Sequence, residues 1–448
     1  MTGSIKLQQR LNFQIQPGGE LNGNLRVPGD KSISHRSIML GSLADGVTRV
    51  KGFLEGEDSL ATLNAFRQMG VTIEGPDSGR LTIRGVGVDG LQLPQNPLDL
   101  GNSGTSMRLL TGLLAGQGMA VTLTGDSSLS GRPMKRVIDP LSQMGADIGS
   151  TAEFTAPLQI HPRTRLQGID YPLPMASAQV KSALLLAGLF AEGETCVTEP
   201  APTRDHTERM LQGFGYPVRR SGNRICLTGG GRLTGCEIDI PADISSATFF
   251  LVGAAIADGS DMVLEHVGIN PTRDGVISIL KLMGADLELS NQREVGGEPV
   301  ADIRIRSSRL NGIDIPEELV PLAIDEFPAL FVAAACAQGE TRLRGAEELR
   351  VKESDRIQVM AEGLQRLGIQ ADPTPDGILI QGGTLRGGRV ESYGDHRIAM
   401  SFAMAGLKAA NPIEIADCTN VNTSFPGFVS AAAAAGLRIH EVANQWPG

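Results

Sequence analysis

The sequence predicts an α/β (α+β) protein built from six copies of one helix–strand unit. Three observations lead to this prediction. The chain has 448 residues, which is too long for one hydrophobic core. Helical segments rich in small apolar residues recur six times, each followed by a second helix. Short runs of β-branched residues lie between the helices, and this alternation is typical of helices packed against sheets.

The first helix of each unit carries apolar residues at helical spacing and is rich in alanine, which indicates a buried helix. Glycine closes five of these segments near the expected C-cap. The sixth runs on to Asn411 and Pro412, which also stop a helix. The six segments are residues 31–46, 104–118, 176–193, 244–259, 325–339 and 395–410.

The second helix of each unit ends in an apolar turn followed by glycine, at a period of about 70 residues. The six segments are residues 58–70, 132–145, 204–215, 273–284, 353–368 and 425–436. Predicted strands between helices include residues 121–125, 301–307 and 377–382.

Six units divide naturally into two domains of three. Residues 28–29 and 241–243 each lie just before the first helix of a unit, so we expect the chain to cross between domains there. The first domain would then be discontinuous, with residues 1–29 and 243–448, and the second would hold residues 30–242. Two crossings would also make a hinge. A solenoid that only binds partners is the alternative, but polar motifs at the helix starts disfavour it.

The composition excludes several classes of protein. The net charge of −10 argues against a nucleic-acid or anionic-membrane partner. No stretch approaches the roughly 20 apolar residues of a membrane span, and the first residues resemble neither a signal nor a transit peptide. A cytoplasmic protein is therefore expected. The five cysteines are scattered and lack C-x-x-C spacing, so we expect buried thiols in a reducing compartment and no structural zinc site.

The starts of the predicted helices carry the residues that suggest chemistry, because free N–H groups and the helix dipole favour anions there. Lys31, Ser32 and Arg36 could form one contact set for phosphate or carboxylate. The alternative is an exposed basic turn capped by Asp30 or Ser32. Cations at a helix N-terminus are electrostatically misplaced unless an anion compensates them, which favours a binding site.

Four further helix starts in the first half of the chain are weaker signals. Gly104 lies in a glycine-rich turn that lacks Walker spacing, and such turns are often only structural. Arg132 belongs to a basic cluster of which one member is expected to face a ligand. Ser177 and Gln179 offer a hydroxyl and an amide, with capping as the alternative. Arg204 is again a cation where an anion belongs.

In the second half, Asp325 precedes an apolar helix, where a carboxylate could simply complement the helix dipole. Lys352, Glu353 and Arg356 form a charged cluster whose alternative explanation is a solvated face, and Arg397 opens the sixth unit. These groups occupy the same position in five units, as one converged active site would require. The site would bind phosphate and carboxylate groups and use two free carboxylates, Asp325 and Glu353, for acid–base catalysis without a metal or nucleotide.

The motifs PGDKSISHRS, GNSGTSMRLL, GRPM, MASAQVKSALLLAG, TRDHTERM, NPTRDG, IDEFP, LRVKESDRI and GDHRIAMSF, in this order over essentially the whole chain, resemble the EPSP synthase (3-phosphoshikimate 1-carboxyvinyltransferase) family. GDKS, SAQVK, RDHTE and NPTR together resemble its second class, whose members are often glyphosate-tolerant. The resemblance implies an inside-out α/β barrel in two domains, each with three β-α-β-α-β-β repeats, that close around the substrates in a cleft.

The implied reaction transfers the enolpyruvyl group of phosphoenolpyruvate to the 5-hydroxyl of shikimate 3-phosphate in the shikimate pathway, without a cofactor and in a monomer. By motif position, Asp325, Glu353 and Lys31 would be catalytic. Shikimate 3-phosphate would contact Lys31, Ser32, Arg36, Ser177, Ala178, Gln179, Arg204, Asp325 and Lys352. Phosphoenolpyruvate would contact Lys31, Gly104, Arg132, Gln179, Arg356 and Arg397.

The chain departs from the family pattern in two places. Tolerant second-class members carry alanine where Gly104 stands, so sensitivity to the inhibitor glyphosate is expected. Some members carry lysine before the Phe425 turn, but this chain has Thr423 and Ser424, so no ligand contact is assigned there. The sister enzyme acting on UDP-N-acetylglucosamine is disfavoured because residues 127–132 lack its loop cysteine. A non-catalytic scaffold remains the rival from another class.

Overall fold

A computed structural model describes residues 10–162 and 165–444 of the chain. The described residues form two compact units. The first holds residues 10–28, 242–293 and 300–444, and the second holds residues 29–162, 165–241 and 294–299. The short segment 294–299 leaves the first unit and returns to it, and no pattern in the sequence indicated this excursion.

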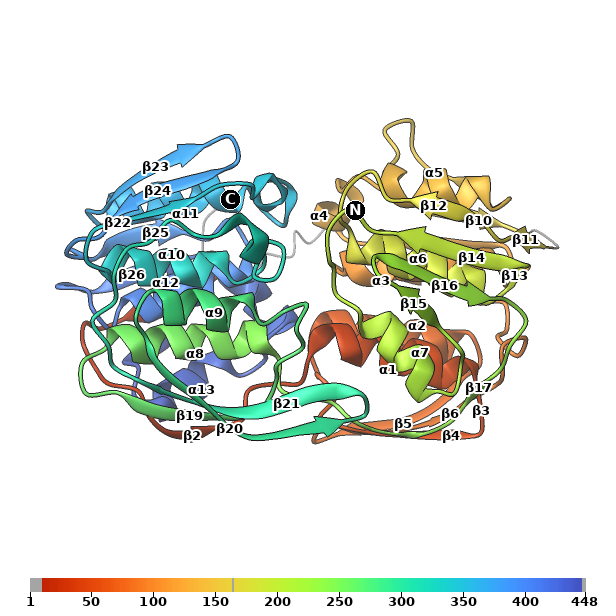
Figure 1. The fold of residues 1–448 in the computed structure, drawn as a ribbon, viewed down its shortest axis with the longest axis horizontal. Helices are drawn as coiled ribbons and strands as arrows, with labels where there is room; N and C mark the ends of the chain where they lie inside the picture. The colour runs from red at the N-terminus through yellow and green to blue at the C-terminus, as the bar shows by residue number, and fades with distance from the viewer. Residues whose placement is uncertain (1–9, 163–164, 445–448) are drawn as a thin grey trace, which may run out of the picture. The chain divides into compact units, whose positions relative to one another are not determined.

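All twelve predicted helices are present (Figure 1). The first helices of the units are α1 (Lys31–Leu43), α3 (Gly104–Ala115), α6 (Ala178–Gly188), α8 (Ile244–Ile256), α10 (Phe327–Cys336) and α12 (His396–Ala405). The second helices are α2 (Glu57–Gln68), α5 (Lys135–Gln143), α7 (His206–Gly213), α9 (Gly275–Leu282), α11 (Arg356–Arg366) and α13 (Phe428–Ala435). The short elements are α4 (Ser127–Ser130) and the 3-10 turns η1 (Glu317–Leu319), η2 (Glu347–Val351) and η3 (Thr419–Thr423).

The second unit repeats one sheet pattern three times. Each sheet begins with a parallel pair, and two antiparallel strands follow it. In sheet order, the strands are β18 (Glu237–Asp239), β4 (Val47–Lys51), β6 (Arg80–Arg84), β5 (Thr72–Asp77); β7 (Leu98–Asp99), β8 (Val121–Thr124), β10 (Leu158–His161), β9 (Asp147–Gly149); and β12 (Asp170–Pro172), β14 (Glu194–Thr198), β16 (Arg224–Thr228), β15 (Arg219–Ser221). Two small pairs add β17 (Leu233–Thr234) with β3 (Ala44–Asp45) and β11 (Leu166–Gln167) with β13 (Ala191–Glu192).

The first unit also has three sheets. In sheet order, they are β25 (Gly388–Glu391), β26 (Ile413–Ala416), β1 (Arg10–Ile15), β27 (Ile439–Asn444); β2 (Asn22–Leu25), β19 (Asp261–Gly268), β21 (Glu298–Arg306), β20 (Asp286–Val295); and β22 (Glu340–Leu343), β24 (Gly377–Gln381), β23 (Gln370–Thr374). Two of them again start with a parallel pair, β25–β26 and β2–β19. In the third sheet, one isolated parallel bridge from Asp314 to Arg342 takes that place.

Each unit has its own apolar core with the first helices at its centre. In the first unit, α8, α10 and α12 contact one another, and Figure 1 shows the sheets of that unit around them. In the second unit, α3 packs on α6 at Gly112, where an added Cβ would lie 2.1 Å from the carbonyl oxygen of Ala183. Only glycine allows so close an approach of two helix backbones. The predicted fold class, with helices inside and sheets outside, is confirmed.

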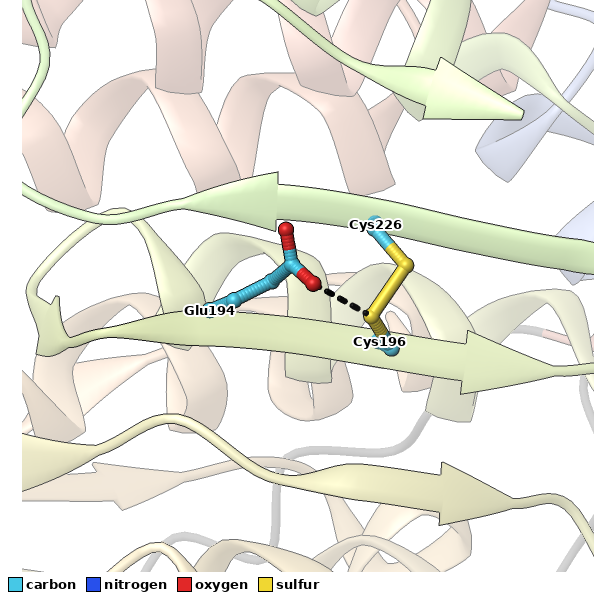
Figure 2. A group of neighbouring side chains, drawn as sticks. All are labelled: Glu194, Cys196 and Cys226. Carbon is cyan, nitrogen blue, oxygen red and sulfur yellow. Dashed lines mark hydrogen bonds between the residues drawn. A yellow bond between two sulfur atoms is a disulfide. The ribbon is translucent and has the colours of Figure 1, made fainter. Parts of the chain in front are cut away.

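The expectation of five free thiols is wrong for one pair. Cys196 on β14 and Cys226 on β16 are directly opposite in the antiparallel register, with Cα atoms 4.1 Å apart, and their sulfurs are bonded (Figure 2). Glu194 lies on the same face, and one of its carboxylate oxygens is 3.4 Å from the Cys196 sulfur. Strand register brings together two cysteines that are 30 residues apart, and no local motif announces it.

No helix among the described residues is both long enough and apolar enough to cross a membrane.

Thiol titration tests the cysteine pair. In protein alkylated at the moment of cell lysis, three thiols should have reacted after denaturation without reductant, and five after reduction, because one pair is bonded. In the native protein, Cys336 should react slowly at pH 8, because burial raises the pKa of its thiol to about 12. Five reactive thiols without reductant would contradict the disulfide.

Candidate active site

The start of α1 places Lys31 and Arg36 on the second unit. Asp30 caps the helix, and its carboxylate accepts a hydrogen bond from the Ile33 amide at 2.9 Å. Lys31 forms an ion pair with Asp58 of α2, whose side chain is only 7% exposed. The sequence suggested that a ligand would supply the anion for this basic turn. The carboxylate of Asp58, on the neighbouring helix, already compensates the charge of Lys31. No motif in the sequence pointed to Asp58.

Arg36 is buried, with 3% of its surface exposed. Its guanidinium donates to the Thr207 hydroxyl at 2.7 Å, to the Ser182 hydroxyl at 2.9 Å, and to the Ser32 carbonyl at 2.9 Å. Burial lowers the pKa of Arg36 to about 10, and the nearby charge of Arg204 lowers it further, whereas Glu208 opposes the shift. Arg36 and the half-buried Arg204 therefore belong to one cationic site.

His35, on the same helix, ties α1 to its neighbours. Its Nδ1 lies 2.8 Å from the Thr62 hydroxyl and 3.3 Å from the Ser106 hydroxyl, so one ring links α1, α2 and α3. Burial lowers the pKa of His35 well below its ordinary value, and the charges of Lys31 and Arg36 lower it further. The ring is therefore neutral at pH 7, and it fixes the helix without adding a charge.

The starts of α3 and α6 are joined through Gln179. Ser103 caps α3 by accepting from the Ser106 amide at 3.1 Å, and Ser177 caps α6 by accepting from Val180 at 3.4 Å. Gln179 is therefore not a cap. Its carbonyl accepts from Arg108 at 2.8 Å, and its amide donates to Thr105 at 3.1 Å.

Gly104 opens α3 beside two guanidinium groups. A Cβ added there would lie 3.0 Å from a nitrogen of Arg108 and 3.0 Å from a nitrogen of Arg132. Arg132 is oriented by the Asn102 side chain, which accepts from it at 2.7 Å. In the second unit the structure thus brings the predicted Gly104, Arg132 and Gln179 together around Arg108, which the motif analysis had not selected.

Arg356 organises the candidate site of the first unit. It is 1% exposed and opens α11. Its guanidinium donates to Asp395 at 2.9 Å, to Asp325 at 3.3 Å and to Glu353 at 2.5 Å. Burial alone would lower the pKa of Arg356, but the three carboxylates outweigh it and raise this pKa above its ordinary value. The guanidinium therefore stays charged.

One prediction about this cluster is wrong, and one alternative explanation of it is excluded. Asp325 and Glu353 are not free, because both pair with Arg356. A solvated charged face is also excluded for Arg356 by its burial, since a guanidinium at this depth needs paired carboxylates. Asp395, which accepts from Arg356 at 2.9 Å and also caps α12, was missed because its position is equally typical of a plain capping residue.

The remaining cations of the first unit lie at the edge of this cluster. Lys352 pairs with Glu348 at 2.6 Å and lies 3.7 Å from Asp325. Arg397 donates to the backbone carbonyl of Asp325 at 3.2 Å. The predicted Asp325, Lys352, Glu353, Arg356 and Arg397 therefore form one constellation of alternating charge. Such an arrangement can exchange an internal carboxylate for that of a substrate and can move protons.

The fold and these two constellations define a transferase of the enolpyruvyl type. The family model for EPSP synthase (3-phosphoshikimate 1-carboxyvinyltransferase) matches residues 15–431. A relative in Alkalilimnicola ehrlichii named 3-phosphoshikimate 1-carboxyvinyltransferase is 70% identical over 430 residues, 96% of each chain. One of the same name in Methylococcus capsulatus is 69% identical over 427 residues, 95% of this chain and 98% of its own.

The solved EPSP synthase of Acinetobacter baumannii is similar with a TM-score of 0.88 and 60% identity, covering 96% of this chain and all of that one. The chain therefore belongs to the EPSP synthase family, the 3-phosphoshikimate 1-carboxyvinyltransferases of the shikimate pathway.

Substitution of Asp395 tests the pairing of Arg356. Asp395→Asn keeps a capping side chain but removes the charge, and a lost hydrogen bond to a charged group costs about 1.5–3 kcal/mol. We expect the free energy of unfolding in urea to fall by about that amount. Asp258→Asn is the control, because its ion pair with Lys408 is on the surface. Equal effects of the two substitutions would contradict the role of Asp395.

Proposed function

We propose that this protein transfers the enolpyruvyl group of phosphoenolpyruvate to the 5-hydroxyl of shikimate 3-phosphate and releases phosphate, in chorismate and aromatic amino-acid biosynthesis. The observation that carries the proposal is the buried Arg356 with Asp325 and Glu353 in a chain of this family. Carboxylates held beside a cation can bind an acidic substrate by exchange of partners and then serve as proton carriers.

Shikimate 3-phosphate would be bound mainly by the cationic site of the second unit. Lys31, Ser32, Arg36 and Arg204 would contact its phosphate, and the α6 start would add Ser177, Ala178 and Gln179. Support comes from the electrostatic coupling of Arg36 to Arg204, since cations that repel one another gain stability when a dianion binds between them.

Phosphoenolpyruvate would use cations of both units: Lys31, Arg132, Arg356 and Arg397, with Gly104 and Gln179 beside them. Asp325 and Lys352 would also reach shikimate 3-phosphate. Arg132, which Asn102 orients, and Arg356, which carboxylates hold, are already in fixed positions. Preorganised cations of this kind stabilise charge without reorganisation during reaction.

In the proposed reaction Asp325 accepts the proton of the 5-hydroxyl while the oxygen of that hydroxyl bonds to C2 of phosphoenolpyruvate. Glu353, assisted by Lys31, donates a proton to the C3 methylene, which gives a tetrahedral intermediate. The C2–O bond to phosphate then breaks and phosphate leaves, while the deprotonated Glu353 takes a proton back from C3, which restores the vinyl group. The protein would act as a cytoplasmic monomer without a cofactor. The loop at residues 127–132 has no cysteine, which disfavours UDP-N-acetylglucosamine as the acceptor.

A phosphate-release assay tests this proposal. With phosphoenolpyruvate, release is expected with shikimate 3-phosphate and not with UDP-N-acetylglucosamine. Asp325→Asn should lower kcat about 10²–10⁴-fold, the usual contribution of a general base. Asp258→Asn, the same change at an exposed site, should leave kcat unchanged. Absence of release with shikimate 3-phosphate would refute the function, and full activity of Asp325→Asn would refute the base.

Gly104→Ala tests the proposal that glyphosate inhibits this protein because residue 104 is glycine. The added methyl would lie 3.0 Å from nitrogens of Arg108 and Arg132, so room beside these cations shrinks. Because one methyl in a pocket discriminates by about 10–200-fold, the inhibition constant for glyphosate should rise at least about tenfold. Gly131→Ala is the control, since a Cβ added there would lie 3.7 Å from its nearest neighbour, the carbonyl oxygen of Ser128. Unchanged inhibition in Gly104→Ala would contradict the proposal.

A further inference from the structure

We propose that Glu298 and His206 are positioning residues for the cationic site of the second unit. Glu298, at the tip of the β20–β21 hairpin, holds the segment 203–208 through His206 and thereby sets the position of Arg204. This inference rests on the proposed function, in which Arg204 binds the phosphate of shikimate 3-phosphate.

The contact itself is buried and direct. His206 Nδ1 lies 2.8 Å from Glu298 Oε1, and the two side chains are 2% and 4% exposed. A second contact comes from the same hairpin, since Arg209 donates to the Gly297 carbonyl at 2.7 Å and to Asp205 at 2.9 Å. The tip therefore engages both ends of the first turn of α7. It reaches this place although the rest of the hairpin belongs to the first unit.

The other residues of the segment are anchored from within the second unit. Lys181 is fully buried, pairs with Glu208 at 2.7 Å and with Glu199 at 2.9 Å, and lies 3.5 Å from the Thr203 carbonyl. Thr207 accepts from Arg36 and donates to Ser182 at 2.7 Å. Residues on both sides of His206 thus have anchors within the second unit, whereas His206 and Arg209 contact the hairpin.

Arg204 needs this support because of its charge. Burial is the main cause of the lowered pKa of Arg36, and the positive charge of Arg204 lowers that pKa as well, because the two guanidinium groups repel each other. This repulsion favours a displacement of the Arg204 side chain from the position in which it would bind phosphate. The backbone on either side of Arg204 therefore has to be held in place. Glu298 also offsets the repulsion, because its negative charge acts on Arg36 as well. A displacement of about 1 Å in such a group can cost about 10²-fold in rate.

The test compares Glu298→Ala with Glu294→Ala, the same change at an exposed position of the same hairpin. Glu298→Ala should raise KM for shikimate 3-phosphate at least about tenfold, while kcat falls less than about threefold. Glu298→Gln keeps a hydrogen-bonding oxygen for His206 and should restore most of the affinity. Glu294→Ala should match the wild type. Equal effects of Glu298→Ala and Glu294→Ala would overturn the inference.

A double-mutant cycle separates positioning from general stability. If Glu298 acts through Arg204, then Glu298→Ala should change KM little in an Arg204→Ala background. A full tenfold effect in that background would overturn the proposal, because it would indicate a structural role unrelated to Arg204. Thermal unfolding of each variant, measured alongside, identifies any variant that fails to fold. If Glu298→Ala fails to fold, Glu298→Gln and His206→Gln are compared with Glu294→Ala in its place.

Amide hydrogen exchange gives a readout that does not require activity. Glu298→Ala should speed the exchange of residues 206–210 at least about tenfold relative to Glu294→Ala. Unchanged protection would overturn the positioning role whatever the assay gives. Loss of protection in a protein whose wild type releases no phosphate would leave the hairpin contact supported and refute the proposed function instead.

Discussion

A buried cation needs polar partners, and at two central points of this molecule carboxylates supply them. The buried Arg356 has three carboxylates within hydrogen-bonding distance and the buried Lys181 has two, while the partly exposed Lys31 has Asp58. An unpaired charge at such depth would be too costly to keep ionised. Arg356 and Lys31 also lie at helix starts, where the dipole opposes a cation. The partners come from neighbouring elements, so the packing of helices and the electrostatics of the site depend on each other.

The same pairing bears on reactivity. A cation that already has carboxylate partners is held in position and stays charged, and an acidic substrate can replace one partner without any reorganisation of the site. Asp325 illustrates this, because its carboxylate contacts Arg356 while its backbone carbonyl accepts from Arg397. In the proposed reaction the residue that loses its place beside Arg356 is then the one that accepts the substrate proton.

In the second unit, hydroxyl groups and a hairpin distant in the sequence hold the cationic site in place. Arg36 donates to the hydroxyl groups of Ser182 and Thr207, which carry no charge, so its own charge remains available for an anion. Thr207 belongs to the segment that carries Arg204, and Glu298 at the hairpin tip contacts His206 of that segment. Residues far apart in the chain thus control the geometry of one cationic site.

The sequence by itself determined all twelve helices, because their apolar period and their stop signals are local and recur with each unit. It also determined the family, through motifs spread over the whole chain. Only the tertiary structure decided which charges pair: Asp58 with Lys31, Asp395 with Arg356, and Glu298 with His206. Strand register likewise decided the bond between Cys196 and Cys226. These contacts join residues 27 to 92 positions apart, and no local pattern encodes which distant side chain a buried charge will meet.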